Sequence, residues 1–319
     1  MDERVERALA VAFPDREVAE VEAAGVSWNP GNESVRATFE DGTAAYLKVA
    51  TDGDPSRVRA ERAALAYVGA NRAVPVPKLL ASSTDGEVPF VATAPLSGRN
   101  LAYAWGEYDE RERAAAAREV GVALARLHDE RFDRHGHVGG GDAAGLELDT
   151  GPWTDVLVDT IERLRAAATS DRFPESFDRV IGAVEANRDL LDRAPAALLH
   201  GDPAKPNTFR VDGGVGYVDW ETAHVGDPAR ELYRVRDQAF DDLLDPAPDR
   251  IVDALHEGYR SVAGTLPEGY AERRPVYRAV RLLGTTGFFE ATAEYVDMPE
   301  SEFADWVERE LDRRLSPIE

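Results

Sequence analysis

The chain has 319 residues, of which 43% are hydrophobic and 30% are charged. This balance is typical of a folded protein rather than a disordered one, and the length favours two structural units. No apolar run reaches the roughly 20 residues that cross a bilayer, and the charged N-terminus lacks the apolar core of a signal peptide. The absence of cysteine excludes disulfides and thiolate metal sites. We therefore expect a cytoplasmic protein.

The charge balance is strongly acidic, with 60 acidic and 37 basic residues and a net charge of −23. A field of this sign repels phosphate backbones and anionic membrane surfaces, so we expect neither a nucleic-acid nor a membrane partner. Only Lys48, Lys78 and Lys205 are lysines. Many dispersed acids with almost no lysine resemble the proteins of salt-accumulating halophilic archaea. On this interpretation the acidity is an adaptation to salt and says little about the ligand.

The first 96 residues predict a small α+β unit. Residues 1–22 have a helical pattern, and residues 56–71 have helical periodicity. Segments 33–40 and 43–50 flank Asp41-Gly42, a dipeptide that favours tight primed turns, so they predict a β-hairpin. Extended segments at 74–80 and 88–94 follow. We place the boundary between the two units after residue 96, which leaves residues 97–319 for the second unit.

The second unit is predicted to be mainly helical. Helical patterns cover residues 109–129, 153–167, 173–193, 228–243, 247–263 and 270–293. One β-rich segment, residues 196–220, interrupts them. The glycine-rich stretch from Gly136 to Gly145 is interpreted as a connector because no predicted strand precedes it, and His135 and His137 are interpreted as loop residues.

The residues with the most chemical content lie in segment 196–221, which reads AALLHGDPAKPNTFRVDGGVGYVDWE. A hairpin centred on Gly213 would place Asn207 opposite Asp219, and cross-strand partners lie about 5 Å apart. An amide oxygen and a carboxylate so close together suit Mg²⁺, which takes few protein ligands besides phosphate and water. Asp202, five residues before Asn207, would reach a nucleophile approaching the same phosphate. The alternative is that each of these residues merely caps a turn.

The run HGDPAKPN followed by VDWE resembles the HGDxxxxN…(I/V)DWE signature of aminoglycoside phosphotransferases, choline kinases and related small-molecule kinases. GDPARELYRV resembles the stretch that follows it, and the likeness covers about residues 25–235. It implies an α+β, bilobal, protein-kinase-like fold with a small β-rich N-terminal lobe and a larger helical C-terminal lobe. Asp202 resembles the catalytic aspartate that orients and deprotonates the acceptor hydroxyl, and Asn207 and Asp219 resemble the two magnesium ligands.

Other residues of this region have open or secondary interpretations. His200 is expected to brace the loop, and Asp227 to cap the following helix. Glu221 is either a residue facing the substrate or metal site or a solvated loop acid. Lys205 either reaches the γ-phosphate or lies on the surface. Glu231 stands where the family usually has aspartate, and we assign it no role.

A second part of the site is predicted from helical periodicity. Glu61 lies on the same apolar stripe as Val58 and Leu65, and a carboxylate on a buried stripe needs a partner. Lys48, on the second strand of the first hairpin, is the expected partner, because kinase-like folds pair a strand lysine with a helix glutamate to hold the phosphates of ATP. The alternative partner is Arg57, one helical turn earlier.

The remaining ATP contacts are predicted from position alone. Residues 29–34 precede the hairpin where the family has its nucleotide-binding loop, and backbone amides from Gly31 to Ser34 would face phosphate. Residues 91–96 resemble the inter-lobe hinge, whose backbone would bind adenine.

The sequence thus predicts an ATP- and Mg²⁺-dependent phosphotransferase that acts on a hydroxyl of a small molecule of aminoglycoside, choline, amino-alcohol or sugar type. Residues 1–96 would bind ATP, and residues 97–319 would carry catalysis and the acceptor. The acceptor pocket is expected near Trp153, Glu221, Phe288, Phe289 and Tyr295, although these aromatic residues suit a core equally well. The alternative is a nucleotide-binding pseudokinase that regulates a partner. A protein kinase is disfavoured because HGD and DWE replace the HRD and DFG pattern.

Overall fold

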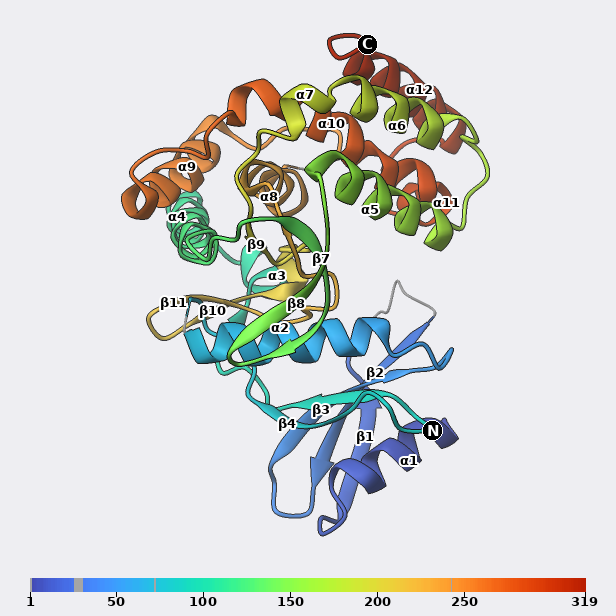
Figure 1. Ribbon diagram of the computed structural model, residues 1–319, viewed down its shortest axis with the longest axis vertical. Coiled ribbons are helices and arrows are strands. Elements are labelled where there is room, and N and C mark those ends of the chain that lie inside the picture. Colours follow the sequence, from blue (N-terminus) through green and yellow to red (C-terminus); the bar gives the residue numbers. More distant parts are fainter. Residues whose placement is uncertain (1, 26–30, 72, 242) are drawn as a thin grey trace.

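The computed structural model spans residues 1–319 and describes all of them except residues 1, 26–30, 72 and 242. Figure 1 shows a small lobe, drawn mainly in blue, below a larger lobe coloured from green to red. The small lobe is built on a sheet, and the large lobe is mostly helical, so the predicted bilobal α+β architecture is confirmed. None of the described helices combines the length and apolarity that crossing a membrane requires.

The small lobe contains a five-stranded antiparallel sheet with the order β1-β2-β3-β5-β4. Its strands are β1 (Val18–Ala23), β2 (Asn32–Phe39), β3 (Ala44–Ala50), β4 (Leu79–Ser83) and β5 (Phe90–Thr93). Helix α1 (Glu3–Ala12) packs Val5 and Leu9 into one apolar cluster with the sheet. Helix α2 (Ser56–Asn71) spans the predicted residues and lies between the two lobes in Figure 1.

Two predictions for this lobe need correction. The helix predicted over residues 1–22 ends at Ala12, because Pro14 disfavours helical backbone at the residue before it, and the alternating segment that follows forms β1. The β2–β3 hairpin is present, but Gly42 is the only described residue of its turn with a left-handed φ, +79°. A primed type I turn needs two such residues. The observed turn has only one, Gly42, and is therefore not of the predicted type.

The large lobe is built from ten α-helices among the described residues: α3 (Leu101–Trp105), α4 (Glu110–Leu127), α5 (Trp153–Ala167), α6 (Ser176–Ala186), α7 (Arg188–Leu191), α8 (Pro228–Val235), α9 (Asp249–Ala263), α10 (Tyr270–Gly287), α11 (Phe289–Ala293) and α12 (Glu300–Leu315). The predicted helix 173–193 is divided into α6 and α7, and 270–293 into α10 and α11. Helix α8 continues as a π-helical turn, Arg236–Phe240. Helix α12 is absent from the predicted set.

Two smaller sheets join these helices. One has the order β11-β10-β6 and contains β6 (Arg99–Asn100), β10 (Thr208–Val211) and β11 (Gly214–Tyr217). The other has the order β8-β7-β12-β9 and contains β7 (His135–Asp142), β8 (Gly145–Gly151), β9 (Ala197–Leu199) and β12 (His224–Gly226).

The predicted glycine-rich connector is therefore wrong, because it forms the β7–β8 hairpin, and His135 and His137 are strand residues. A Cβ on Gly136 would lie 2.4 Å from the carbonyl oxygen of Asp149, so close backbone approach explains a glycine-rich strand. Ala60, Ala63 and Val138 form a small apolar cluster, which packs this hairpin against α2.

Two connections join the lobes, the hinge and a backbone contact of the loop after α2. Strand β5 ends at Thr93 and β6 begins at Arg99, so residues 94–98 form the connection. The backbone N–H of Tyr217 donates to the carbonyl oxygen of Pro75 at 3.1 Å, and a Cβ on Gly216 would lie 2.6 Å from the same oxygen. The loop after α2 is thus held against β11.

Candidate active site

Lys48 and Glu61 form the predicted ion pair. Lys48 lies on β3, opposite Ser34 of β2, and its Nζ is 2.8 Å from Oε2 of Glu61 on α2. Glu61 is 5% exposed, so the position of the carboxylate on the buried stripe is as predicted. The alternative partner of Glu61, Arg57, pairs instead with Glu221, with Nη1 and Oε1 2.9 Å apart.

Two carboxylates of the large lobe complete a cluster around Lys48. Its Nζ lies 2.5 Å from Oδ1 of Asp219 and 3.2 Å from Oε2 of Glu221. Burial alone would lower the pKa of Lys48, but Asp219, Glu61 and Glu221 outweigh it and raise the pKa well above the ordinary value. Burial, with Asp219 and Glu221, raises the pKa of Glu61 to about 7 against the opposing effect of Lys48.

Glu221 connects the lobes. Its side chain is 11% exposed, and it accepts a hydrogen bond of 2.7 Å from Nδ2 of Asn32 in addition to its contacts with Lys48 and Arg57. The interpretation of Glu221 as a solvated loop acid is therefore wrong. Asn32, the first residue of β2, has no signal in the sequence that would have predicted this contact.

Asp219 has unusual backbone geometry. Its φ of +64° is the only left-handed value among the described non-glycine residues. A non-glycine residue in this region is strained, and such strain is often found at functional sites. The next residue, Trp220, is fully buried and donates from Nε1 to the carbonyl oxygen of Tyr217 at 3.0 Å. The strained turn thus anchors Trp220 in the core while the Asp219 side chain, 39% exposed, meets Lys48.

The predicted cross-strand pairing of Asn207 and Asp219 is wrong by one residue. Strands β10 and β11 pair Thr208 with Tyr217 and Val211 with Gly214, because a two-residue turn joins them. The N–H of Val218 accordingly donates to the carbonyl oxygen of Asn207 at 3.0 Å. Asn207 therefore lies opposite the residue before Asp219. Its Nδ2 donates to the carbonyl oxygen of Asp202 at 3.0 Å and to Oδ2 of Asp202 at 3.2 Å.

His200 braces the loop that carries Asp202. It is fully buried, its Nε2 lies 2.9 Å from the carbonyl oxygen of Val218, and the N–H of Asp202 donates to its Nδ1 at 3.2 Å. These contacts fit a neutral imidazole that donates from Nε2 and accepts at Nδ1, and burial lowers the pKa of His200. The predicted bracing role matches this geometry.

Glu231 supports the same loop, a role that the sequence did not suggest. This buried carboxylate of α8 accepts backbone hydrogen bonds from His200 at 3.2 Å and Gly201 at 2.6 Å, and lies 3.0 Å from Nε2 of His128. Burial alone would raise the pKa of Glu231, but the hydrogen bond and charge of His128, with His200 and Gly201, lower it to about 2. The sequence held one signal for this role: Glu231 is a carboxylate on the buried face of a predicted helix and therefore needs a partner.

Asp202 is held by two side chains that sequence reasoning missed. Its Oδ1 accepts from Nη2 of Arg234 and from Nε2 of Gln238, both at 3.0 Å. Burial alone would raise the pKa of Asp202, but Arg234, His200 and Gln238 outweigh it, and the pKa lies below its ordinary value. Asp202 is therefore ionised at neutral pH, and its Oδ2 is the less occupied oxygen.

The predicted phosphate loop is described only in part, because Asn29 and Pro30 lie outside the described residues. The carbonyl oxygen of Gly31 accepts from the N–H of Thr51 at 2.9 Å, and Ser34 pairs with Lys48 across the strands. Lys205 places its Nζ 5.4 Å from the ring centroid of Trp105.

The aromatic residues expected around an acceptor pocket do not share one environment. Trp153 and Phe289 are fully buried core residues, and Nε1 of Trp153 donates to the Tyr277 hydroxyl at 2.9 Å. Phe288 is half-buried, and Tyr295 is 76% exposed. The prediction that Trp153 and Phe289 line an acceptor pocket is therefore wrong, because neither ring reaches solvent.

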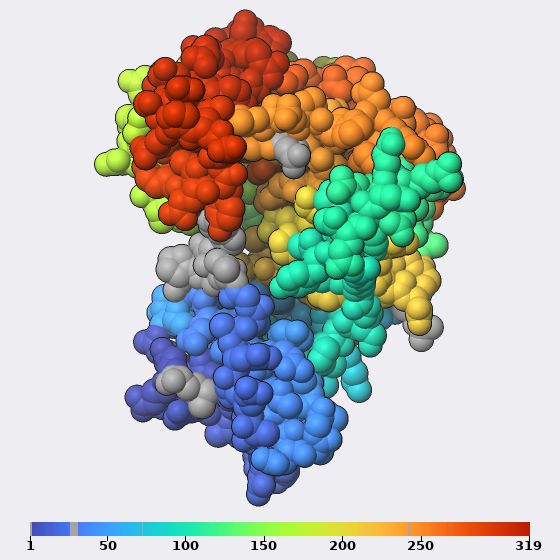
Figure 2. Space-filling view, turned by 180° about the vertical axis from the view of Figure 1, so that it is seen from behind, coloured from blue at the N-terminus to red at the C-terminus, as the bar shows by residue number. Residues whose placement is uncertain are grey.

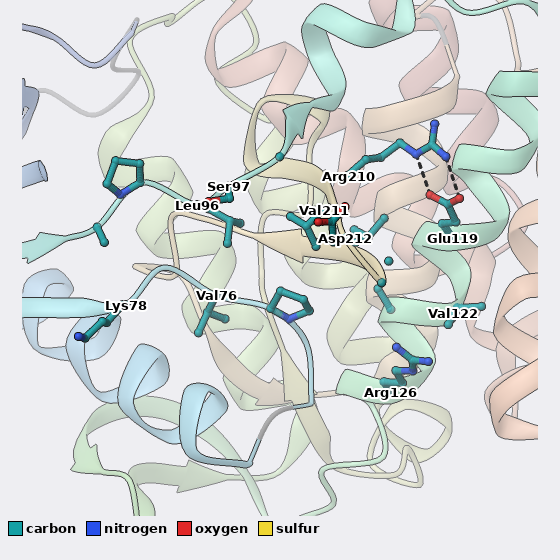
Figure 3. A pocket seen from close by; sticks show the side chains of 18 residues that line it. Val76, Lys78, Leu96, Ser97, Glu119, Val122, Arg126, Arg210, Val211 and Asp212 are labelled. Atoms are coloured by element: carbon teal, nitrogen blue, oxygen red, sulfur yellow. Dashed lines mark hydrogen bonds and ion pairs between the residues drawn. The ribbon is translucent and has the colours of Figure 1, made fainter. Parts of the chain in front are cut away.

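A large pocket lies beside the hinge, and none of these aromatic residues lines it. It has a volume of about 960 Å³ and is lined by hinge residues 94–98, the β10–β11 turn and α4. Figure 3 shows Arg210 forming two contacts with Glu119 at its wall. Of the residues predicted to contact ATP, Mg²⁺ or the acceptor, only hinge residues 94–96 line it, and Lys48, Asp202 and Asp219 do not, so we do not identify it with the catalytic site. From behind, Figure 2 shows yellow-to-brown atoms recessed between the red C-terminal helices and the teal segment around α3.

Comparison with known proteins places this geometry in a family. The model of the phosphotransferase enzyme family matches residues 25–275. No curated protein sequence matches the chain. Among solved structures, the fold is similar to a putative fructosamine-3-kinase from Thermobifida fusca (22% identity, 95% of this chain and 97% of that chain, TM-score 0.58). It is also similar to macrolide 2'-phosphotransferase MphH from Brachybacterium faecium (20%, 98% and 99%, 0.57).

A third similar structure is a thermostable mutant of aminoglycoside phosphotransferase APH(4)-Ia, solved as a ternary complex with ADP and hygromycin B (14%, 98% and 98%, 0.59). The three likenesses cover nearly the whole chain and show that its bilobal fold is that of these kinases. The family model covers well over half of the residues. The chain therefore belongs to the phosphotransferase enzyme family and is a small-molecule phosphotransferase.

Proposed function

We propose that the protein transfers the γ-phosphoryl group of ATP, in a Mg²⁺-dependent reaction, to a hydroxyl group of a small molecule. The observation that carries this proposal is the meeting of Lys48 and Glu61 from the small lobe with Asp219 from the large lobe. Asp202 lies on the loop before β10, where Nδ2 of Asn207 donates to its carbonyl oxygen at 3.0 Å. The carbonyl oxygen of Asn207 in turn accepts from the N–H of Val218, the residue before Asp219, at 3.0 Å. The ADP in the APH(4)-Ia complex supports an adenine nucleotide as the phosphoryl donor.

The residues present fit a magnesium ion by their donor chemistry. Carboxylate and amide oxygens are protein ligands that Mg²⁺ takes, and Asp219 and Asn207 offer one of each. Oxygen atoms of Glu61, Asp219 and Glu221 also lie within 4.8 Å of one another, around Nζ of Lys48. Asp219, which is partly exposed, and the neighbouring Asn207 would hold the ion. When bound, Mg²⁺ supplies positive charge that neutralises the phosphate oxygens.

Lys48 is the residue suited to the α- and β-phosphates. Its ammonium is ionised, only 13% of its side chain is exposed, and Glu61 fixes its direction. A charge held in a fixed place stabilises the phosphates without reorganising during the reaction. Residues 1–96 would accordingly supply most of the nucleotide contacts.

Asp202 is suited to the acceptor. Arg234 and Gln238 occupy its Oδ1, which leaves Oδ2 to accept a hydrogen bond from the acceptor hydroxyl. Because its pKa is lowered, Asp202 is a weak base. We therefore assign it mainly to orienting the hydroxyl for in-line attack, and the proton passes to Oδ2 as the new bond to phosphorus forms.

Two measurements test the proposal. Calorimetric titration with ATP, with and without Mg²⁺ in molar KCl, should show binding that Mg²⁺ tightens. A panel of small alcohols should then yield a phosphorylated product, detected by mass spectrometry, that Asp202→Asn largely abolishes. Absence of ATP binding would contradict the proposal. Binding of Mg-ATP without product from any alcohol would favour the regulatory pseudokinase instead.

A further inference from the structure

Three arginine side chains lie close enough to repel one another, and one of them contacts Asp202. Arg230 and Arg234 lie one turn apart on the same face of α8, and Arg281 lies on α10. Arg234 pairs with Asp202 at 3.0 Å, and Arg281 pairs with Asp237 at 2.7 Å. Arg230 differs from its neighbours, because no described carboxylate lies within ion-pair distance of it. It is nevertheless 5% exposed.

The one side-chain partner described for Arg230 carries no charge. Its Nη1 donates to Nε2 of His224 at 3.1 Å. Nδ1 of His224 lies 2.9 Å from the carbonyl oxygen of Thr222 and donates to it, so Nε2 is the acceptor nitrogen of a neutral ring. Burial and the charge of Arg230 lower the pKa of His224 to about 3, which keeps the imidazole neutral. The hydrogen bond therefore supplies no counter-charge to the guanidinium, and Glu231 acts on it only from beyond ion-pair distance.

The buried acids nearby are engaged elsewhere. Glu231 accepts from the His200–Gly201 backbone and contacts His128, and Asp227 pairs with Arg273 at 2.6 Å. Burial lowers the pKa of Arg230 to about 10, so the side chain is still a cation at neutral pH.

Among the described residues, only Nη1 of Arg230 has a hydrogen-bond partner, and its Nε and Nη2 have none. Neither nitrogen is among the described polar atoms that are both fully buried and without a partner. Each therefore keeps some surface that solvent or a ligand can reach. A buried cation without a counter-ion is costly and is normally paired. A guanidinium group is also the side chain best shaped to bind carboxylate or phosphate through two parallel hydrogen bonds.

We propose that Arg230, flanked by Arg234 and Arg281, binds an anionic group of the acceptor, so that the acceptor is an alcohol carrying a carboxylate or phosphate. The inference rests on the proposed function, because Arg234 links this site to Asp202. The anion supplies the missing counter-charge of Arg230 and fixes the acceptor hydroxyl toward Oδ2 of Asp202. Cationic acceptors such as aminoglycosides would be repelled at the same place.

The test compares acceptors that differ in charge but share a skeleton. One series contains glucose, gluconate, glucose 6-phosphate and glucosamine, and a second contains glycerol, glycerate, glycerol 3-phosphate and 2-amino-1,3-propanediol. Product formation is measured with wild-type enzyme and Mg-ATP. We expect kcat/KM at least about tenfold higher for an acid than for its neutral counterpart, with carboxylate and phosphate distinguished by the two acidic arms.

Variants then assign the effect to Arg230. Arg230→Gln should lower kcat/KM for the acid about tenfold, through KM more than kcat, and leave the neutral counterpart within twofold; Arg230→Lys should recover part of the loss. Arg179→Gln, a remote and partly exposed arginine, is the matched control. If Arg230→Gln does not fold, the wild-type series alone decides.

The outcomes separate the two proposals. Neutral or cationic acceptors used as well as acids would overturn the anion site and leave the phosphotransferase intact. Equal losses for acid and neutral acceptors in Arg230→Gln would also overturn the anion site. Mg-ATP binding without product from any member of either series would overturn the proposed function, and the anion site with it.

Discussion

Lys48 and Asp219 come from opposite lobes, and their side chains meet with Nζ and Oδ1 2.5 Å apart. The contact depends on two independent features: the strand register that points Lys48 toward α2, and the left-handed backbone of Asp219. Because Glu61 also contacts Lys48, the ammonium is held by carboxylates from both lobes.

Coupling between Lys48 and Glu61 is the first prediction. Lys48→Ala should weaken ATP binding and leave Glu61 buried without its cation, whereas Glu61→Gln should reduce activity with less effect on the fold. The double variant should lose less than the sum of the single losses, by roughly 0.5–3 kcal/mol in unfolding free energy. Chemical denaturation and ATP titration of all four proteins measure this. Strict additivity would mean that the two residues are not coupled.

Asp219 and Asp202 should fail in different ways. Asp219→Asn removes a charged oxygen ligand and should abolish the tightening of ATP binding by Mg²⁺. Asp202→Asn should keep Mg-ATP affinity within a few-fold while lowering kcat by ~10²–10⁴. Calorimetry with and without Mg²⁺, followed by turnover measurements, separates the two. Equal loss of metal-dependent binding in both variants would show that the roles are misassigned.

Glu231 should contribute a stability that depends on pH. Its pKa is about 2 in the folded protein against an ordinary value of 4.5, so its ionised form favours folding. The contribution is fully present above about pH 4.5 and is lost as the pH falls toward 2. Glu231→Gln should therefore lower the free energy of unfolding by roughly 3 kcal/mol at pH 7. The gap from wild type should close in acid, and a gap independent of pH would contradict the assignment.

Close packing of α4 on α9 gives a prediction about glycine. A Cβ on Gly121 would lie 2.1 Å from the carbonyl oxygen of Leu255, and one on Gly258 would lie 2.0 Å from that of Arg118. Gly121→Ala and Gly258→Ala should each destabilise the fold by about 2 kcal/mol. Gly182→Ala is the control, because that helical glycine has open space around it and alanine should stabilise by up to about 1 kcal/mol. Thermal midpoints of the three variants check the contrast.

Salt should stabilise the protein. The excess of acidic side chains repels itself most at low ionic strength, since the screening length is about 10 Å at 0.1 M and about 3 Å at 1 M. We expect the thermal midpoint to rise between 0.1 and 1 M KCl. A midpoint that does not change across this range would contradict the halophilic interpretation.

Local sequence signals determined the parts of the site that depend on one element. Helical periodicity placed Glu61 on the buried face of α2, and the hairpin flanking Asp41-Gly42 placed Lys48 on β3. The HGD and DWE motifs located Asp202 and Asp219. The positions of Lys48 and Glu61 were predicted correctly because a period of 2 or 3.6 fixes which face of an element a residue occupies. Asp202 and Asp219 were located by resemblance, and the roles of all four residues stay predictions.

Only the tertiary structure decided the contacts that join distant elements. The register of β10 and β11 depends on the length of their turn, and one residue separates the predicted pairing of Asn207 from the observed one. In the β7–β8 hairpin the two backbones approach so closely that Gly136 and Gly141 leave no room for a Cβ. Because glycine has a low strand propensity, the sequence alone argued against a strand there. The contacts of Asn32 with Glu221, of Arg234 with Asp202 and of Arg230 with His224 follow from how the lobes and helices pack. A single sequence gives no sign of which distant side chains will meet. These contacts are set by how the helices and strands pack.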